Sequence, residues 1–317
     1  LKIYKQKIIN KEFSEKYFLT EELNLPFIAH NGIIKSSRSA IEIALFDLIS
    51  QEKQEPLYKT LNSLSKNRPL EVYASSGSVI FDEDQIQSDV EYILGKNFKS
   101  YKMRIGLKNI YTDIKRIKKS REVLGNNNLM LDAIMGTLKQ KWDINQCLEN
   151  IEMIKEFKPL WLEEPLNPQD VFAYKNLVQK SDIDIAFGES FTSYNEFLFA
   201  IENQSANYLQ PDVTNCGYLD LIKLFNSRGS YKNFNYAMHV WGSPISLLAN
   251  MHFALAYEKI KYLELPMVKL EFLNNKIKDL YTIKEGKFEY DDRNAGIGIK
   301  LEENDIKNFD YIDRSEE

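Results

Sequence analysis

Short apolar runs that close on a polar residue recur through the middle of the chain. Between them lie longer stretches in which apolar residues recur with a helical period. In residues 113–125, for example, Ile114, Ile117 and Leu124 fall on one side, and Gly125 is typical of a helix C-terminus. The pattern predicts short buried strands that alternate with helices. The runs occupy residues 70–75, 101–104, 129–132, 160–163, 185–189, 208–212, 236–239 and 262–264.

The spacing of the runs predicts a repeated strand–helix unit. Each run supplies one marker residue: Tyr73, Lys102, Asp132, Glu163, Glu189, Asp212, His239 and Glu264. Successive markers lie 23 to 31 residues apart, which is about the length that one strand, one helix and two loops need. Eight such strands closing on themselves predict an α/β fold with a parallel barrel of the TIM type.

The two ends of the chain follow a different pattern. Residues 39–49 have the composition of a strongly apolar helix, and a polar stretch follows as far as Asn67. After Pro266 the pattern predicts short strands and turns, including turns at 284–287 and 295–298. We therefore expect a barrel over residues 69–266 and an α+β capping domain formed by the N-terminal segment 1–68 and the C-terminal tail 267–317.

Composition and charge narrow the class of protein. The 317 residues are 44% hydrophobic and 27% charged, which is typical of a globular protein with a large core. A net charge of −5 with dispersed Lys and Arg gives no reason to expect nucleic acid as a partner. No apolar run approaches the roughly 20 residues of a membrane span. Only Cys147 and Cys216 are present, which argues against a disulfide framework and favours a reducing, cytoplasmic setting.

Candidate chemistry lies where the strands end, because the active site of a β/α barrel is at the carboxyl ends of its strands. Lys102 and Arg104 share one face of their strand, since side chains alternate with a period of two. Carboxylates on consecutive strands form an all-oxygen site, which suits Mg²⁺ better than Zn²⁺. A divalent cation would also relieve their mutual repulsion. The polar residues that close six of the runs are Asp132, Glu163, Glu189, Asp212, His239 and Glu264.

In these residues the sequence resembles the mandelate racemase subgroup of the enolase superfamily, from about residue 39 to residue 298. Each motif alone is a weak signal, but all of them in this order and at this spacing are a strong one. The motifs are Lys102-Met-Arg104, Leu131-Asp132-Ala133, Trp161-Leu-Glu163-Glu-Pro, Gly188-Glu189, Gln210-Pro-Asp212, His239-Val-Trp-Gly-Ser and Leu263-Glu264.

The resemblance implies a capped (β/α)7β barrel, a Mg²⁺ cofactor and a small-molecule carboxylic acid as substrate. It implies that His239 is the acid/base, oriented and made more basic by Asp212. It also implies that Lys102 helps to hold the substrate carboxylate and that Glu264 hydrogen-bonds to the enediolate from the far side. The implied metal ligands are Asp132, Glu163 and Glu189.

Arg104 departs from the pattern of family members that racemise, which commonly have a second lysine there as a base. A guanidinium stays protonated up to about pH 12 and makes a poor base. One base at His239 fits elimination: it takes the α-proton, then protonates the departing 3-hydroxyl, and the enol tautomerises to a 2-keto-3-deoxy acid. We therefore expect an acid-sugar dehydratase of the aldonate type, in which Arg104 binds a distal hydroxyl or carboxylate.

Three other functions stay open. A racemase or epimerase of a 2-hydroxy acid is the main alternative within the superfamily. A barrel that binds metal for stability without catalysis is the second. A phosphate-binding barrel of unrelated chemistry is the third, although the loops after His239 and Glu264 are not the Gly-rich loops that would suit phosphate. Asp212 stands where the muconate-cycloisomerising and dipeptide-epimerising subgroup has Lys, which argues against those reactions.

Several residues also have a purely structural interpretation. Lys102 could cap a barrel layer by pairing with Glu163 or Glu164, and strand alternation predicts that Glu164 turns away from the face that holds Glu163. His30 and His252 are expected to be structural. Trp161 and Trp241 are expected to pack at the barrel rim. The resemblance further implies a homo-oligomer, and only about 40 residues precede the helix at 39–49, which predicts a shortened cap.

Overall fold

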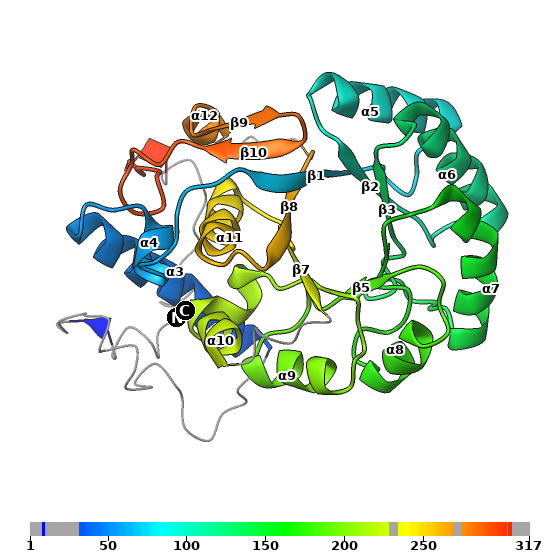
Figure 1. Ribbon diagram of the computed structural model, residues 1–317, viewed down its shortest axis with the longest axis horizontal. Coiled ribbons are helices and arrows are strands. Elements are labelled where there is room, and N and C mark those ends of the chain that lie inside the picture. The colour runs from blue at the N-terminus through cyan, green and yellow to red at the C-terminus, as the bar shows by residue number, and fades with distance from the viewer. Residues whose placement is uncertain (1–7, 10–31, 228–233, 269–273, 303, 306–317) are drawn as a thin grey trace, which may run out of the picture.

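The computed structural model describes residues 8–9, 32–227, 234–268, 274–302 and 304–305 (Figure 1). Within them, eight parallel strands close into a barrel, because β1 pairs with β8 as well as with β2. The predicted α/β barrel is therefore confirmed. The strands are β1 (Leu70–Ser76), β2 (Ser100–Arg104), β3 (Asn128–Asp132), β4 (Leu162–Glu163), β5 (Ile185–Phe187), β6 (Tyr208–Leu209), β7 (Asn235–Met238) and β8 (Ile260–Pro266).

Helices join successive strands and form the outer layer, which Figure 1 shows most clearly from α5 to α8. One helix lies between each pair of successive barrel strands, and after β8 the structure describes the short helix α12 (Asn274–Ile277), so the described barrel has the predicted (β/α)7β order. The helices between strands are α5 (Glu83–Gly95), α6 (Ile110–Leu124), α7 (Ile144–Ile154) with a 3₁₀ turn at Lys155–Phe157, α8 (Val171–Val178), α9 (Tyr194–Glu202), α10 (Val213–Ser227) and α11 (Pro244–Ala256).

Side-chain caps explain where several of these helices begin. Asp82 and Gln85 form a reciprocal capping box at the start of α5. Asn109, Asp143 and Asp170 each accept a hydrogen bond from a backbone N–H in the first turn of α6, α7 and α8. These caps satisfy amide groups that have no partner inside the helix, so the short loops after the strands pass directly into helices.

An aromatic layer fills the inside of the barrel below the carboxyl ends of the strands. The Trp161 ring lies 5.4 Å from the Tyr73 ring and 4.8 Å from the Tyr208 ring, measured between centroids. Trp161 is fully buried, so its predicted packing role is correct, but it packs inside the barrel instead of at the rim. This layer forms a rigid floor for the polar side chains above it.

The predicted capping parts lie on one side of the barrel. Helices α3 (Ile33–Glu52) and α4 (Leu57–Leu61) pack against α10 and α11, on the left of Figure 1. The hairpin β9 (Tyr281–Lys284) and β10 (Lys287–Tyr290) adds to β1 in antiparallel pairing. Its turn at Glu285 and Gly286, both with positive φ, confirms the turn predicted at 284–287. The domain boundaries at 68 and 266 stay predictions, and residues 1–7, 10–31 and 306–317 lie outside the described residues.

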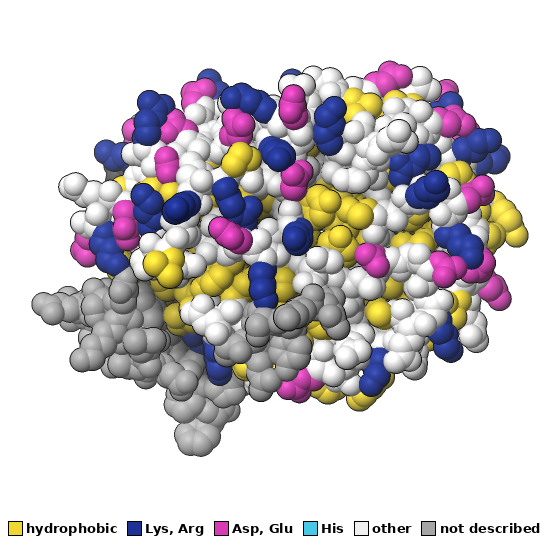
Figure 2. Space-filling model, in the orientation of Figure 1, with side chains coloured by type: hydrophobic (Ala, Val, Ile, Leu, Met, Phe, Trp, Pro, Cys, Tyr) yellow, Lys and Arg dark blue, Asp and Glu magenta, His cyan; other side chains and the backbone are white. Residues whose placement is uncertain are grey.

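Other features bear on the class of protein. No helix in the described part of the chain has both the length and the apolar character needed to cross a lipid bilayer. Cys147 and Cys216 are both free and buried, in agreement with the expected lack of a disulfide framework. On the face shown in Figure 2, acidic and basic side chains are interspersed, with hydrophobic side chains exposed between them.

Candidate active site

The carboxyl ends of the strands bring the predicted site residues to one place. Ion pairs with N–O distances of 2.5 to 4.0 Å join all of them into one network. The network is centred on two cationic groups, the Lys102 ammonium and the His239 imidazole. Its members are Lys102, Arg104, Asp132, Glu163, Glu189, Asp212, His239 and Glu264.

Lys102 is buried at the centre of one half of the network. Its Nζ lies 2.5 Å from Glu163 Oε1, 2.9 Å from Glu264 Oε1 and 3.8 Å from Asp132 Oδ2. Burial alone would lower the pKa of Lys102, but the charges of Glu163 and Glu264 raise it well above its usual value. The ion pair with Glu163 matches the structural alternative considered for Lys102, and it is compatible with holding a substrate carboxylate as well.

Glu163 is held on both of its oxygens. Its Oε2 accepts hydrogen bonds from Trp161 Nε1 at 3.0 Å and from Gln210 Nε2 at 2.7 Å, while Oε1 faces Lys102. The sequence motif contained Gln210 but gave it no role. The amide oxygen of Gln210, Oε1, is buried and has no hydrogen-bond partner among the described residues. Gln210 is therefore a support for Glu163 that spacing alone did not identify.

His239 and Asp212 form the predicted pair in the other half of the network. His239 Nδ1 lies 2.9 Å from Asp212 Oδ2, and Nε2 lies 3.5 Å from Glu189 and 4.0 Å from Glu264. Burial alone would lower the pKa of His239, but the charge of Glu189 and the hydrogen bond to Asp212 raise it to about 10. The imidazole thus binds Asp212 through Nδ1 and presents Nε2 to the mouth of the barrel.

Glu264 connects the two halves. Its Oε2 accepts a hydrogen bond from the backbone N–H of Val240 at 3.0 Å. Burial alone would raise the pKa of Glu264, but the nearby charges of Lys102 and His239 lower it to about 2. Glu264 is therefore an ionised acceptor fixed between the lysine and the imidazole.

Arg104 is tied to the end of β1. Its Nη1 donates to Ser76 O at 3.1 Å and its Nη2 to Ser75 Oγ at 3.2 Å. Its guanidinium lies 4.7 Å from the centroid of the Trp241 ring, a cation–π contact. Trp241 is 50% exposed. Its ring lies over the Arg104 guanidinium at the edge of the mouth, which agrees with the position expected for it at the rim.

The regular strand alternation ends at Glu164. Its φ of 40° breaks the extended backbone directly after β4, so the alternation of faces ends there. The side chain is buried, and Oε1 has no hydrogen-bond partner. Burial, followed by the charges of Glu189 and Asp132, raises the pKa of Glu164 to about 9. Burial therefore favours the neutral form of the Glu164 carboxyl group.

The three predicted metal ligands fit Mg²⁺ in chemistry but are not assembled around one point. Among the residues that the structure describes, no three acidic, histidine or cysteine side chains are arranged to hold a metal ion. Glu163 is engaged by Lys102, and Glu189 faces His239. The donor set is nevertheless all oxygen. Burial raises the pKa of Asp132, Glu163 and Glu189, although Lys102 or His239 acts in the opposite direction. The network contains five carboxylates (Asp132, Glu163, Glu189, Asp212 and Glu264) against three groups that can carry positive charge (Lys102, Arg104 and His239), so it has a deficit of positive charge.

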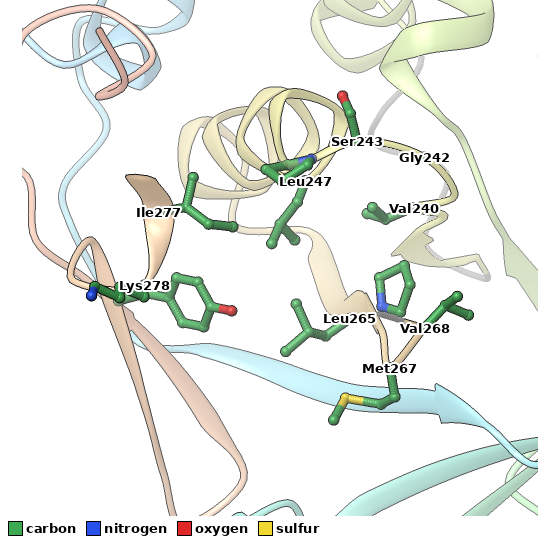
Figure 3. Close-up of a pocket in the computed structure, with 12 residues that line it drawn as sticks. Val240, Gly242, Ser243, Leu247, Leu265, Met267, Val268, Ile277 and Lys278 are labelled. Atoms are coloured by element: carbon green, nitrogen blue, oxygen red, sulfur yellow. The ribbon is translucent and has the colours of Figure 1, made fainter. Parts of the chain in front are cut away.

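A cavity of about 260 Å³ lies beside β7 and β8 but outside the network (Figure 3). Leu265 lines it, and strand alternation places Leu265 on the opposite face from Glu264. None of the network residues is part of its wall, so we assign it no role in the candidate site. The wall consists of Val240, Gly242, Ser243, Pro244, Leu247, Leu265, Pro266, Met267, Val268, Ile277, Lys278 and Tyr281.

Comparison with known proteins agrees with this architecture. A family model described as enolase C-terminal domain-like matches residues 85–305. The chain is 27% identical over 282 residues to L-talarate/galactarate dehydratase of Salmonella typhimurium (strain LT2), a match that covers 87% of this chain and 66% of that protein. It is 28% identical over 204 residues to 3,6-anhydro-alpha-L-galactonate cycloisomerase of Streptomyces coelicolor, covering 64% of this chain and 55% of that protein.

A similar fold also occurs among solved structures. The 3,6-anhydro-D-galactonate cycloisomerase from Zobellia galactanivorans superimposes with a TM-score of 0.80 and 24% identity, covering 93% of this chain and 80% of that one. At this identity the likeness concerns the fold alone. The chain spans about two thirds of the length of the Salmonella relative and about half of the Streptomyces relative.

Proposed function

The chain belongs to the enolase C-terminal domain-like family, and on that premise we propose that it is a magnesium-dependent hydro-lyase that removes water from a sugar acid of the aldonate type. The family match confirms the resemblance to the enolase superfamily that the motifs predicted. A relative named as a dehydratase of two sugar acids supports this reaction class, and a relative named as a cycloisomerase keeps an isomerase as the alternative.

The observation that carries the proposal is the contrast between His239 and Arg104. His239 is bonded through Nδ1 to a buried carboxylate, and its Nε2 is directed into the network. Arg104 takes the place of a second base, and two hydrogen bonds hold it against β1. A guanidinium does not exchange protons at neutral pH. One acid/base group is enough for elimination, whereas racemisation needs a proton donor on the opposite face.

The residues then divide the reaction as follows. Lys102 binds the substrate carboxylate, and His239 Nε2 takes the proton from the α-carbon. Electrons from the broken C–H bond form an enediolate, to which Glu264 makes a hydrogen bond. The His239 imidazolium returns its proton to the 3-hydroxyl, the C3–O bond breaks, and water leaves. The enol product becomes a 2-keto-3-deoxy acid, and His239 is neutral again.

Asp132, Glu163 and Glu189 are the residues that would hold Mg²⁺. The ion would supply positive charge where the substrate carboxylate becomes more negative, and it would offset the Glu189 charge that raises the pKa of His239. Closing these ligands around an ion requires Glu163 to be shared with Lys102. The all-oxygen donor set and the deficit of positive charge support this assignment.

A substrate screen tests the proposal. The purified protein with Mg²⁺ would be incubated with a panel of aldonic and aldaric acids, and 2-keto-3-deoxy products would be detected with semicarbazide. We expect product from one or two acids, and a loss of at least about 10³-fold in His239→Asn, because the acid/base group acts in both proton transfers. His252→Gln, which changes a histidine outside the network, serves as the matched control and should retain product formation.

Two results would contradict the proposal in different ways. Incorporation of solvent deuterium at C2 of an unreacted acid, without keto product, would indicate a racemase or epimerase. Stabilisation by Mg²⁺ with neither exchange nor product across the panel would indicate a metal-binding barrel without this catalysis.

A further inference from the structure

Asn250 is a buried side chain that contacts both Asp212 and the backbone beside it. It lies in the middle of α11 and is 0% exposed. Its Nδ2 donates to Asp212 Oδ1 at 2.9 Å and to Ser246 O at 3.1 Å. Its Oδ1 accepts a hydrogen bond from the Val213 N–H at 2.8 Å. Every polar atom of this amide therefore has a partner, and two of its three contacts are at Asp212 or the next residue.

The hydrogen bonds to Asp212 are divided unequally between its two oxygens. Oδ1 accepts from Thr214 N at 2.8 Å, from Thr214 Oγ1 at 2.7 Å and from Asn250 Nδ2. Oδ2 faces His239 Nδ1. Three donors on one oxygen fix the plane of the carboxylate, because rotation would break all of them at once. Oδ2 is thereby held in the direction of the imidazole.

Asn250 also connects the two elements that carry the pair. Helix α10 begins directly after Asp212, and α11 begins five residues after His239. Thr214 fixes Asp212 to its own helix, whereas Asn250 fixes it to the helix that follows His239. The backbone contact from His239 N to Pro211 O, 3.0 Å, holds the two loops together at the other side.

We propose that Asn250 is a positioning residue that acts on His239 through Asp212. It keeps the Asp212 carboxylate oriented so that His239 carries its proton on Nδ1 and directs Nε2 to the mouth of the barrel. This inference rests on the role proposed for His239. A structural amide that only bridged two helices would have no reason to place its donor on Oδ1 of this aspartate.

Two substitutions separate positioning from simple packing. Asn250→Asp keeps the side-chain size and the acceptor for Val213, but replaces the donor with a carboxylate that repels Asp212. Asn250→Leu removes all three side-chain hydrogen bonds, those with Asp212, Val213 and Ser246. Asn150→Leu is the matched control, because Asn150 is a buried asparagine on the barrel helix α7, 4% exposed, outside the network.

The main readout is the ¹⁵N and ¹H signals of the His239 ring, which need no substrate. We expect both Asn250 variants to lose the Nδ1–H signal of a hydrogen-bonded imidazole, and Asn150→Leu to keep it. With an active substrate in hand, kcat should fall by about 10²-fold in Asn250→Asp with little change in KM, since a displaced base affects the chemical step.

An unchanged His239 signal in Asn250→Asp would overturn the inference, even if that variant were less stable. So would an equal loss of the signal in Asn150→Leu. If Asn250→Leu does not fold, Asn250→Asp decides the question. A changed ring signal in a protein that converts no sugar acid would leave the positioning role standing and reject the proposed reaction instead.

Discussion

Lys102 is a buried cation that holds two buried carboxylates, Glu163 at 2.5 Å and Glu264 at 2.9 Å. It provides positive charge beside Asp132 and Glu163, two of the three residues proposed to hold Mg²⁺. Its ammonium also lies 5.3 Å from the centroid of the Tyr73 ring in the floor of the barrel. We infer that this lysine keeps Glu163 and Glu264 together, and that Mg²⁺ binding would require Glu163 to be shared between the ion and Lys102.

Replacement of Lys102 by methionine tests that inference. Lys102→Met leaves two carboxylates without their cation, and we expect the free energy of unfolding without Mg²⁺ to fall by about 3–5 kcal/mol. Mg²⁺ should then stabilise the variant more than it stabilises the wild type, which urea unfolding with and without the ion would measure. Lys155→Met, which removes an exposed lysine with two exposed partners, should change the free energy of unfolding little. Equal stabilisation of both proteins by Mg²⁺ would count against a metal site beside Lys102.

His252 has the structural role expected of it. The Nδ1 atom of His252 accepts a hydrogen bond from the Tyr58 N–H at 3.3 Å, and its Nε2 lies 3.2 Å from Ile297 O. His30, for which the same role was expected, lies outside the described residues. Burial lowers the pKa of His252 to about 4. The neutral ring thus joins α4 and the C-terminal segment to α11.

The pH dependence of stability tests this arrangement. An unfolded histidine has a pKa near about 6.5, so the unfolded chain binds the additional proton between about pH 6.5 and pH 4. The neutral His252 ring therefore makes its full contribution to the free energy of unfolding above about pH 6.5. We expect this contribution to fall by about 3 kcal/mol as the pH drops from about 6.5 to about 4. In His252→Gln this part of the decrease should disappear from urea unfolding curves. If the variant shows the same decrease in the free energy of unfolding as the wild type, the decrease is due to groups other than His252.

At the scale of the element, the contact between α3 and α10 depends on a break in α10. Gly217 has φ 80° and ψ 164°, which interrupts the helix. Glu42 of α3 enters the break, where its Oε2 accepts a hydrogen bond from the Leu219 N–H at 3.0 Å and its Oε1 pairs with Arg38 at 2.6 Å. Glu42 therefore caps the second half of α10 and joins it to α3.

Gly217→Ala should weaken this contact. A Cβ at this position would lie 2.5 Å from Glu42 Oε2, and the positive φ disfavours a side chain. We expect a loss of about 1–3 kcal/mol in the free energy of unfolding, seen as a lower melting temperature. Gly95→Ala is the control, because a Cβ added there would meet no described atom within 4 Å and the φ of Gly95 is not positive. That change should be neutral or stabilise by up to about 1 kcal/mol; a comparable loss there would show that the effect is not specific to the break.

At the scale of the whole molecule, the regular features were predictable from the sequence. The barrel followed from the spacing of the apolar runs, since each strand–helix unit needs a similar length of chain. The site residues came together because carboxyl ends of parallel strands share one face, so a position after a strand is also a position in space. The ion-pair network is the result of that rule.

Features that depend on packing between helices were not predictable in this way. Asn250 lies 38 residues from Asp212 and within an apolar helix pattern, so only the packing of α11 on α10 reveals its contact. The end of the extended backbone at Glu164 depends on one positive φ, which the apolar pattern does not encode. The position of the Trp241 ring over Arg104 depends on the conformation of the loop that follows β7.

The closure of the barrel by β1 and β8 has a consequence for synthesis on the ribosome. β1 is complete at Ser76, but its partners β8 and β10 begin only at Ile260 and Lys287. Until those residues emerge, the nascent chain carries an open sheet with two unpaired edges, which are templates for association with other chains. The barrel can therefore close only after most of the described chain has been synthesised, which makes the order of synthesis the reverse of what early protection of β1 would need.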